Sequence, residues 1–380
     1  MSALLCWLAL ALTYGTPVDA IDAAVADGIG GGVYPAAVVV IGTGHRILYA
    51  RGYGHFTWSA ASPAPDPDSS LFDLASLTKV VATTPAAMVL AEDGRLDLDR
   101  PVQDYLPDFR GEGKERVTVR ELLEHRSGMR AFLPLNERAD DAAQARALVL
   151  AEPLQTPPGT RVEYSDLNAM LLGWVIEAVT GETLDAFVTR RVFRPAGMSQ
   201  TQFRPPRALR SRIVPVGLWR GHAIAGEIHD QNAARLGGVS GHAGLYSTGM
   251  DLARYAQILL TGGLTADSVQ VFSSGVIRHF TRRGPGNRAL GWEMRNPEDD
   301  ASTGSRLSLD AFGHGGFTGT SIWIDPRRDL FVIVLTNRVF APRTGRSITK
   351  LKEIRARIAD AAVALRDVTC RSTPGPEGPC

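Results

Sequence analysis

The sequence predicts an α+β fold in which an antiparallel sheet is built from both ends of the chain. Apolar, β-branched runs lie at 36–41 and 47–53 near one end and at 320–324 and 330–336 near the other. Each pair is divided by a short polar turn, as in a hairpin. Helical patterns fill the middle of the chain. We therefore expect a sheet flanked by terminal helices, with a mostly helical lobe inserted between its two halves.

Amphipathic spacing predicts the helices in order. Ile21, Val25 and Ile29 recur at helical intervals, and the glycines at 30–32 end that segment. A helix is expected from Ser76 to Asp93, with a kink caused by Pro85. A long, basic, amphipathic helix is expected over 344–366. Further helical patterns cover 117–124, 139–151, 167–179, 184–193 and 251–260.

This pattern divides the chain into four parts. Residues 1–20 form a probable signal peptide by their composition, and 367–380 form a tail rich in proline and glycine. The α/β lobe comprises 21–75 together with 285–366, and the helical lobe comprises 76–284. The two lobes are expected to fold as one unit.

The first residues predict export to the periplasm or the exterior. The apolar run within 1–12 is shorter than the roughly 20 residues that span a bilayer, but it suits the core of a signal peptide. Val18-Asp19-Ala20 would be the cleavage site, although no positive charge precedes the run. The alternative is the buried first helix of a cytoplasmic protein. Cys370 and Cys380 would either form a disulfide in an oxidising compartment or remain free thiols.

Composition excludes several classes of function. The chain has 41 Lys and Arg against 40 Asp and Glu, a formal net charge of +1, whereas nucleic-acid binding needs a concentrated basic face. A hydrophobic fraction of 44% and a charged fraction of 21% indicate a globular chain. No spacing of Cys or His typical of a zinc site occurs, and no apolar run after residue 13 is long enough for a membrane span. We expect no cofactor and no metal.

A Ser-x-x-Lys motif offers two candidate nucleophiles, at 76–79 and at 347–350, while the Gly-x-Ser-x-Gly motif of α/β-hydrolases is absent. Ser76 follows a strand-like segment and begins an apolar helix, where free N–H groups favour a developing alkoxide. Lys79 lies on the same helical face. Because apolar residues follow it, burial is expected to lower the pKa of Lys79.

Ser347 instead lies in a run of basic residues, so it is expected to be a surface helix residue. Ser76 is therefore the preferred nucleophile. The alternative for Ser76 is a helix-capping serine next to a lysine whose amine reaches solvent.

Two further motifs follow in order, Tyr164-Ser165-Asp166 and His314-Gly315-Gly316. The order Ser-x-x-Lys, Tyr-x-Asn, Lys/His-x-Gly resembles the signature of the serine β-lactamase and penicillin-binding superfamily. The chain is similar to its class C-like branch, which also contains D-alanyl-D-alanine carboxypeptidases, family VIII esterases and cell-wall amidases. The similarity extends from 21 to 366 and implies a β-lactamase/transpeptidase-like fold. It includes the segments 94–102, 122–129, 157–159, 228–230 and 237–247, the last two resembling peptidoglycan carboxypeptidases and muramyl-amide hydrolases.

The resemblance implies a role for each motif residue. Ser76 would be the nucleophile, Lys79 its base, and Tyr164 the group that passes the proton to the leaving group. A phenol, with a pKa of about 10, needs neighbouring cations for this task, which Lys79 and a protonated His314 would supply. The backbone N–H groups of Ser76 and Phe317 would form the oxyanion hole. Structural alternatives are a core tyrosine at 164 and a turn histidine at 314.

Substrate-binding residues are implied in the same way. Gly315 and Gly316 would let their strand approach the substrate closely. Asp166 replaces the usual Asn, and its carboxylate is expected to raise the pKa of Lys79, to move the base role to Tyr164, and to repel a substrate carboxylate. His314 replaces the usual Lys, so carboxylate binding would depend on its protonation. His242 would line the substrate pocket, the alternative being a hydrogen-bonded loop histidine.

The sequence thus predicts a serine hydrolase that forms an acyl-enzyme through Ser76. A small molecule or a peptidoglycan peptide would be the substrate, and cleavage of a D-Ala-D-Ala-type peptide or amide bond is the preferred reaction. A carboxylesterase and a β-lactamase on the same scaffold are alternatives. A penicillin-binding sensor that acylates without turnover is an alternative from another class.

Overall fold

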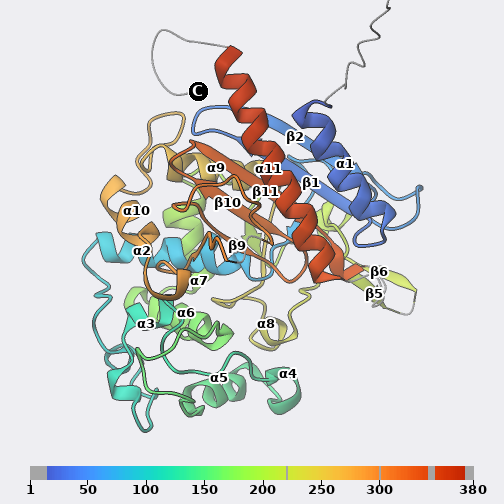
Figure 1. Ribbon diagram of the computed structural model, residues 1–380. Helices are drawn as coiled ribbons and strands as arrows, with labels where there is room; N and C mark the ends of the chain where they lie inside the picture. The colour runs from blue at the N-terminus through green and yellow to red at the C-terminus, as the bar shows by residue number, and fades with distance from the viewer. Residues whose placement is uncertain (1–14, 220, 299–300, 341–346, 373–380) are drawn as a thin grey trace, which may run out of the picture.

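The structure, a computed structural model, describes residues 15–219, 221–298, 301–340 and 347–372. The α-helices are α1 (Pro17–Gly30), α2 (Thr84–Glu92), α3 (Val119–Leu123), α4 (Leu135–Arg138), α5 (Ala142–Ala151), α6 (Asp166–Thr180), α7 (Leu184–Val188), α8 (Gln231–Arg235), α9 (Gly249–Leu260), α10 (Ser274–Thr281) and α11 (Ile348–Ser372). In Figure 1, α1 and α11 lie across the sheet, and a lobe of helices and loops lies below it. The predicted α+β class is confirmed.

The main sheet is antiparallel, with strand order β2-β1-β11-β10-β9-β8. Its strands are β1 (Ala36–Gly42), β2 (Ile47–Gly54), β8 (Glu293–Met294), β9 (Phe312–Gly315), β10 (Ser321–Asp325) and β11 (Leu330–Thr336). The two ends of the chain meet at the pairing of β1 with β11, where Ala37 lies opposite Thr336. This is the sheet built from both ends that the terminal apolar runs predict.

Strand β1 is apolar throughout because both faces of the sheet are covered. Its residues Val38 and Val40 pack into the core shared with the helical lobe. Val39 and Ile41 alternate with them and pack into the second core, which α1 and α11 cover. Alternation between the two faces is the expected period of a strand.

The region after Ser76 differs from the predicted single helix. Helical backbone begins at Leu77, continues as a π-helix over Lys79–Thr83, and becomes α2 at Thr84. Pro85 therefore occupies the first turn of α2, where its missing N–H costs nothing. The turn before Pro85 is a wider π turn in place of the α-helical turn that was expected, and it accommodates the proline ring.

Several short strands near the site were not evident as patterns. Strand β9 is rich in glycine, which weakens any strand signal, yet it pairs with β10 along its whole length. The strand-like segment before Ser76 contains β3 (Phe72–Asp73), which forms a small sheet with β7 (Leu245–Ser247) and β4 (Gln202–Phe203). Strand β5 (Gly217–Trp219) pairs with β6 (His222–Ile224).

The signal-peptide prediction remains untested. Residues 1–14 and 373–380, including Cys380, lie outside the described residues. Cys370 is disulfide-bonded, so the free-thiol alternative is wrong for this residue. Helix α1 begins with a capping box between Thr16 and Asp19, so the suggested cleavage site lies in its first turn. In the part of the chain that the structure describes, no helix has the length and apolarity of a membrane span.

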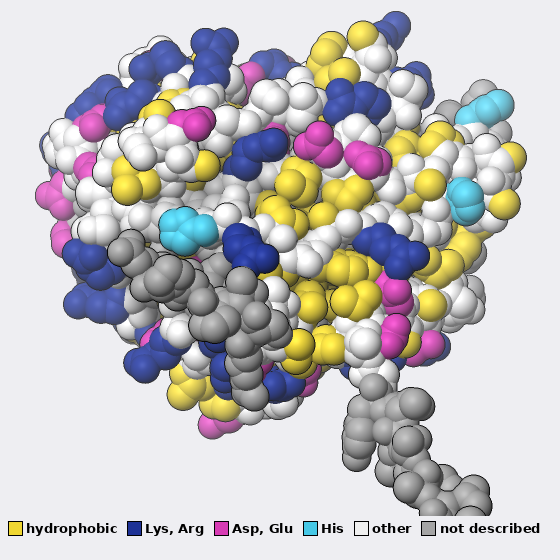
Figure 2. Space-filling model, turned by 90° about the horizontal axis from the view of Figure 1, so that it is seen from above, with side chains coloured by type: hydrophobic (Ala, Val, Ile, Leu, Met, Phe, Trp, Pro, Cys, Tyr) yellow, Lys and Arg dark blue, Asp and Glu magenta, His cyan; other side chains and the backbone are white. Residues whose placement is uncertain are grey.

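The balanced charge is also visible on the surface. On the face shown in Figure 2, Lys and Arg side chains lie in separate groups among acidic and apolar side chains.

Candidate active site

Ser76 lies in a turn between β3 and the first helical residue. The residue before it, Ala75, has a φ of 46°, a left-handed conformation that is rare outside glycine. The turn continues through hydrogen bonds from Leu77 N–H to the Leu74 carbonyl and from Thr78 N–H to the Ala75 carbonyl. Ser76 thereby lines a cavity of about 460 Å³ between the two lobes.

Three predicted residues meet at the Ser76 hydroxyl. Lys79 Nζ lies 3.0 Å from Ser76 Oγ, and the Tyr164 hydroxyl donates to the same oxygen at 3.0 Å. Lys79 reaches Ser76 from one turn along the helix, and Tyr164 comes from the segment directly before α6. The serine oxygen therefore lies between an ammonium and a phenol. Either group can accept the serine proton once it has itself lost a proton.

The charge state of Lys79 differs from the prediction based on burial alone. Its Nζ donates to Ser76 Oγ, to Asp166 Oδ1 at 2.8 Å and to the His242 carbonyl at 3.1 Å. Burial lowers the pKa of Lys79, but Asp166 and Tyr164 together outweigh it, so the pKa lies above its ordinary value. The expectation of a lowered pKa was wrong, and the expected effect of Asp166 is confirmed.

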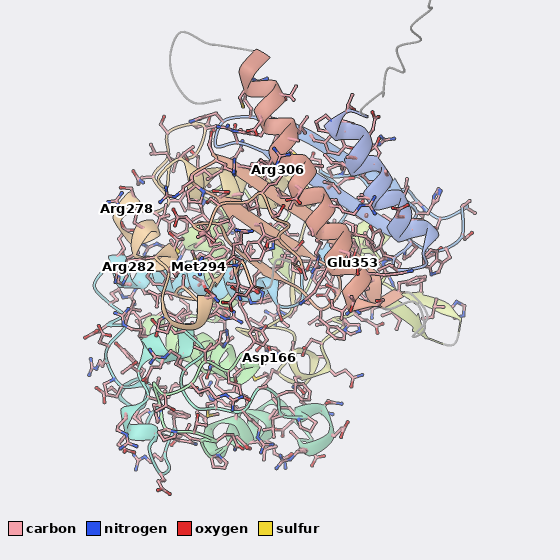
Figure 3. All side chains as sticks on the ribbon, viewed as in Figure 1. Asp166, Arg278, Arg282, Met294, Arg306 and Glu353 are labelled. Carbon is pink, nitrogen blue, oxygen red and sulfur yellow. The ribbon has the colours of Figure 1, made fainter. Side chains whose placement is uncertain are left out.

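Asp166 is the first residue of α6 and lies where the helical lobe meets the sheet (Figure 3). Burial raises the pKa of its carboxyl, but Lys79 and His242 together outweigh it, so that the pKa lies below its ordinary value. The pair is thus an ammonium and a carboxylate whose charges cancel. The repulsion of a substrate carboxylate expected from Asp166 is weakened accordingly.

His314 lies in β9 with its ring centre 5.7 Å from that of Tyr164. Burial, with the nearby charges of Lys79 and Arg288, lowers its pKa to about 3. The ring is therefore neutral, and its Nδ1–H donates to the Gly315 carbonyl at 2.8 Å. The predicted protonated His314 is wrong, because a cation in this buried place beside Lys79 is unfavourable.

Because His314 is neutral, the second cation near Tyr164 is Arg288. Its guanidinium carbon lies 5.4 Å from the centre of the Tyr164 ring, and Lys79 Nζ lies 5.0 Å from it. His125 supports the same ring from another side, with ring centres 4.8 Å apart, while its Nδ1 accepts the N–H of Ser165. Burial lowers the pKa of His125 well below its ordinary value, so it is neutral.

The predicted oxyanion donors are available. Neither the N–H of Ser76 nor that of Phe317 donates to an acceptor within the described residues. The turn that carries Phe317 is tied to β3, because the Thr318 hydroxyl donates to the Asp73 carbonyl at 2.7 Å. The Thr320 hydroxyl donates to the Leu74 carbonyl at 3.0 Å.

Glycine is present at the two positions of the motif for different structural reasons. A Cβ at Gly316 would lie 2.5 Å from the Leu74 carbonyl oxygen, so the close approach requires glycine there. A Cβ at Gly315 would have Arg355 Nη1 as its nearest neighbour, at 3.5 Å. The steric prediction therefore applies to Gly316 alone, and the absence of a side chain at Gly315 leaves Arg355 accessible from the cavity.

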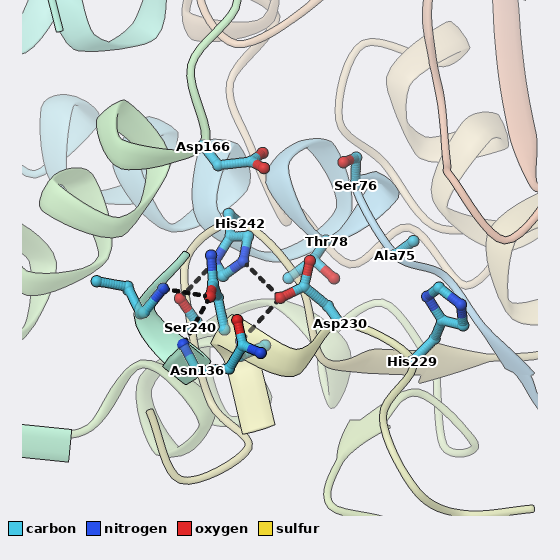
Figure 4. A network of polar contacts seen from close by, with 12 residues as sticks. Ala75, Ser76, Thr78, Asn136, Asp166, His229, Asp230, Ser240 and His242 are labelled. Carbon is cyan, nitrogen blue, oxygen red and sulfur yellow. Dashed lines mark hydrogen bonds and ion pairs between the residues drawn. The ribbon is translucent and has the colours of Figure 1, made fainter. Parts of the chain in front are cut away.

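His242 does not place its side chain in the cavity. Its ring is buried between Ser240 Oγ at 2.7 Å and Asp230 Oδ1 at 3.1 Å, as Figure 4 shows. Only its carbonyl contacts the site, through Lys79. The assignment of His242 as a substrate-binding side chain is corrected to a positioning contact. Within the described residues, no three His, Cys, Asp or Glu side chains form a group that could hold a metal ion.

The far side of the cavity is basic. Lys352 and Arg355 of α11 line it together with Arg288 and Glu293. Burial and the charge of Arg338 lower the pKa of Arg355 to about 10, which leaves the guanidinium charged at neutral pH. The predicted basic, amphipathic helix thus turns part of its charge toward the cavity. Ser347 lies at the start of α11, where its hydroxyl accepts the N–H of Lys350.

The comparisons with known proteins agree with this arrangement. The family described as Beta-lactamase matches residues 21–355. The chain belongs to the beta-lactamase family. A relative from Escherichia coli (strain K12) is 31% identical over 346 residues, covering 81% of this chain and 80% of that protein, and carries a D-alanyl-D-alanine carboxypeptidase name.

Solved structures of this family share the fold. EstCE1, a hydrolase with promiscuous acyltransferase activity, has a TM-score of 0.73 at 22% identity and covers 90% of this chain and 98% of its own. A penicillin-binding protein homolog from Caulobacter crescentus has a TM-score of 0.72 at 20% identity, covering 92% and 99%. A class C beta-lactamase has a TM-score of 0.72 at 18% identity, covering 90% and 96%. The chain is a serine hydrolase of the beta-lactamase family.

Asp166→Asn is expected to shift the pH dependence of acylation. Without the carboxylate, the lowering effect of burial is no longer offset by Asp166, so the pKa of Lys79 falls. The alkaline inflection that reports Lys79 should then move to lower pH. The acylation rate measured against pH tests this, with the exposed Asp68→Asn as control. An unmoved inflection would contradict the role given to Asp166.

Proposed function

We propose that this chain is an exported serine D-alanyl-D-alanine carboxypeptidase that cleaves the C-terminal residue from peptidoglycan peptides. The observation that carries the proposal is the position of Arg355, a buried cation that lines the same cavity as the nucleophile. A carboxypeptidase must bind the free carboxylate of its substrate next to the scissile bond. The D-alanyl-D-alanine carboxypeptidase name of relatives at 31% identity supports the same reaction.

The proton leaves Ser76 for the Tyr164 oxygen. In the reactive form the Lys79–Tyr164 pair holds one proton fewer, and Asp166 keeps the remaining proton on Lys79. The phenol oxygen is then the base, with Lys79 and Arg288 as the cations beside its ring. As Ser76 Oγ bonds to the peptide carbonyl carbon, Tyr164 accepts its proton and passes it to the leaving amine.

The carbonyl oxygen becomes an oxyanion between the N–H groups of Ser76 and Phe317. Loss of one such donor lowers a rate by about 10²–10³-fold. Collapse of the intermediate breaks the peptide bond and leaves the acyl group on Ser76. A water molecule then attacks the ester, Tyr164 accepts a proton from the water and returns it to Ser76 Oγ, and the shortened peptide leaves.

Arg355 is the proposed partner of the substrate carboxylate. It is 5% exposed, its Nη2 donates to the Thr320 carbonyl at 2.7 Å, and its buried Nε lacks a hydrogen-bond partner in the described chain. The missing side chain at Gly315 leaves the guanidinium open to the cavity. A guanidinium with a remaining donor suits a carboxylate better than a lysine does.

Arg355→Gln is expected to raise KM for a peptide ending in D-Ala-D-Ala by about 10–100-fold, because a charge-assisted hydrogen bond worth about 1.5–3 kcal/mol is lost. Turnover of a neutral short-chain ester should change little. The steady-state kinetics of both substrates test this, with Arg357→Gln as control, since Arg357 lies on the same helix as Arg355 but is exposed and pairs with Asp27 of α1. Equal losses on both substrates would contradict carboxylate binding by Arg355.

The export component rests on the apolar run within 1–12. Expression of the full chain in a bacterial host, followed by fractionation and N-terminal sequencing, tests it. Recovery of a chain shortened by about 20 residues from the exported fraction is expected. Full-length chain confined to the cytoplasm would contradict it.

A carboxylesterase is the second candidate, and the neutral His314 favours it. Because His314 is neutral, strand β9 places no positive charge next to Tyr164 that would attract an anionic substrate. Rapid turnover of short-chain p-nitrophenyl esters without release of D-alanine from a peptide would favour the esterase. Mass measurement after exposure to a penicillin separates the others: a stable adduct fits a carboxypeptidase or a sensor, and consumed drug without an adduct indicates a β-lactamase.

A further inference from the structure

A buried carboxylate lies three residues before the nucleophile. Asp73, at the end of β3, is 3% exposed and uses both carboxylate oxygens on backbone N–H groups. Its Oδ1 accepts the N–H of Ala75 at 2.9 Å, and its Oδ2 accepts the N–H of His229 at 2.9 Å. Neither the sequence motifs nor the mechanism above gives this carboxylate a task.

The bond to Ala75 fixes the turn that directs the Ser76 N–H. Ala75 has a φ of 46°, which costs an L-residue free energy and persists only where the surroundings hold it. A charged acceptor on its N–H is such a restraint. Because Ser76 follows directly, the orientation of its N–H depends on this conformation.

The same residue contacts the other half of the oxyanion hole. The Asp73 carbonyl accepts the Thr318 hydroxyl at 2.7 Å, directly after Phe317. Its carboxylate holds His229, whose ring centre lies 5.4 Å from that of Phe317. Figure 4 shows Ala75 and His229 on the Ser76 side of the network. Asp73 is thus bonded to the turns that carry both N–H donors, while it touches neither donor.

We propose that Asp73 is a positioning residue that sets the spacing and direction of the two oxyanion-hole N–H groups, one from Ser76 and one from Phe317. The inference rests on acylation of Ser76, and it holds for a peptide, an ester or a β-lactam alike. A shift of a few tenths of an ångström in either donor weakens a bond whose strength depends steeply on geometry.

The charges around Asp73 add a pH dependence. Burial, with a smaller contribution from the Asp230 carboxylate, raises its pKa to about 6 against the lowering effect of the two N–H bonds. Tyr246 and Glu227 also lie nearby, and His229 is the adjoining titratable ring. Above about pH 6 the carboxylate accepts both bonds, whereas below it the protonated carboxyl loses one of its acceptor oxygens. Acylation should therefore decrease as the pH falls through about 6.

Asp73→Asn tests the proposal because the amide keeps one acceptor oxygen and resembles the protonated carboxyl. The acylation rate at pH 7.5, followed with a p-nitrophenyl ester or a fluorophosphonate probe, is expected to fall about 10–100-fold. Affinity for a boronic acid that forms a tetrahedral adduct should fall in parallel, with KM for the ester within about twofold. The wild-type inflection near pH 6 should disappear.

Two comparisons separate positioning from loss of structure. Asp66→Asn removes a carboxylate that also accepts two backbone N–H groups, from Asp68 and Ser69, in a loop away from the site, and should leave every parameter unchanged. Thr318→Val removes the hydroxyl bond from the Phe317 side with Asp73 intact and should lower acylation and boronic acid affinity in the same way.

The possible failures are distinguishable. If wild-type Ser76 takes no acyl or phosphonyl group, the proposed function fails. If the wild type acylates and both Asp73→Asn and Thr318→Val acylate equally well, the Asp73 proposal alone is overturned. Two results with Asp73→Asn would also overturn it in favour of a purely structural carboxylate. One is a raised KM and slower acylation together with loss of cooperative unfolding, and the other is an unchanged inflection near pH 6.

Discussion

Ser76→Ala is expected to abolish covalent labelling and to lower hydrolysis by about 10⁴–10⁶-fold, whichever acyl group the cavity accepts. The hydroxyl receives hydrogen bonds from Lys79 and Tyr164, and no other hydroxyl of the cavity occupies that position. The fold should be unaffected, since Ser76 lies in a turn at the cavity wall and its side-chain bonds are to the catalytic partners Lys79 and Tyr164. Intact-protein mass after exposure to a penicillin or a fluorophosphonate, together with steady-state rates, measures the effect.

Ser347→Ala is the matched control because it alters the second Ser-x-x-Lys motif. The Ser347 hydroxyl accepts the N–H of Lys350 at the start of α11, which predicts a small loss of helix stability of about 1 kcal/mol and full activity. Labelling that persists in Ser76→Ala and disappears in Ser347→Ala would contradict the choice between the two motifs.

Tyr164→Phe is expected to lower both acylation and deacylation by about 10²–10⁴-fold, the usual contribution of a general acid–base group. Phenylalanine keeps the ring that packs against His125 and His314, so the change removes one oxygen from the site and little else. Lys79 remains charged by Asp166 and cannot replace the lost base. Burst and steady-state phases with a p-nitrophenyl ester measure the two steps separately.

Tyr105→Phe provides the comparison for this variant. Its hydroxyl accepts the N–H of Asp97, far along the chain from the motif residues, so its loss should leave both phases unchanged. Wild-type acylation in Tyr164→Phe would transfer the base role to Lys79, and the mechanism proposed here would then be wrong.

The sequence was sufficient for those parts of the fold that follow from local patterns. Strand β1 is apolar over its whole length, and the predicted sheet of terminal strands follows from such runs. Strand β9 carries no such signal, because two glycines in four residues leave no side chains to pack on one face. The π turn at Lys79 also escaped prediction, because helical periodicity cannot distinguish it from an α-helix.

The candidate site likewise contains residues that the sequence predicts and residues that it does not. The spacing of Ser76 and Lys79 predicts their contact, and the ordered motifs add Tyr164. The neutral state of His314 follows from burial beside two cations, which spacing along the chain does not reveal. Arg355 and Asp73 were missed for a related reason: a charged residue inside an amphipathic helix or a short strand reads as solvated until the structure shows what encloses it.

The route of the chain delays the moment at which the enzyme becomes active during synthesis. Ala36 N–H bonds to Asn337 Oδ1 across 301 positions, so the sheet closes only when its last strands have left the ribosome. Ser76, Lys79 and Tyr164 emerge early, but Phe317, with its half of the oxyanion hole, emerges among the last elements. Closing so long a loop is slow, because its entropy is lost before the strand contacts form. A nascent chain therefore carries its nucleophile for most of its synthesis without the means to stabilise a tetrahedral intermediate.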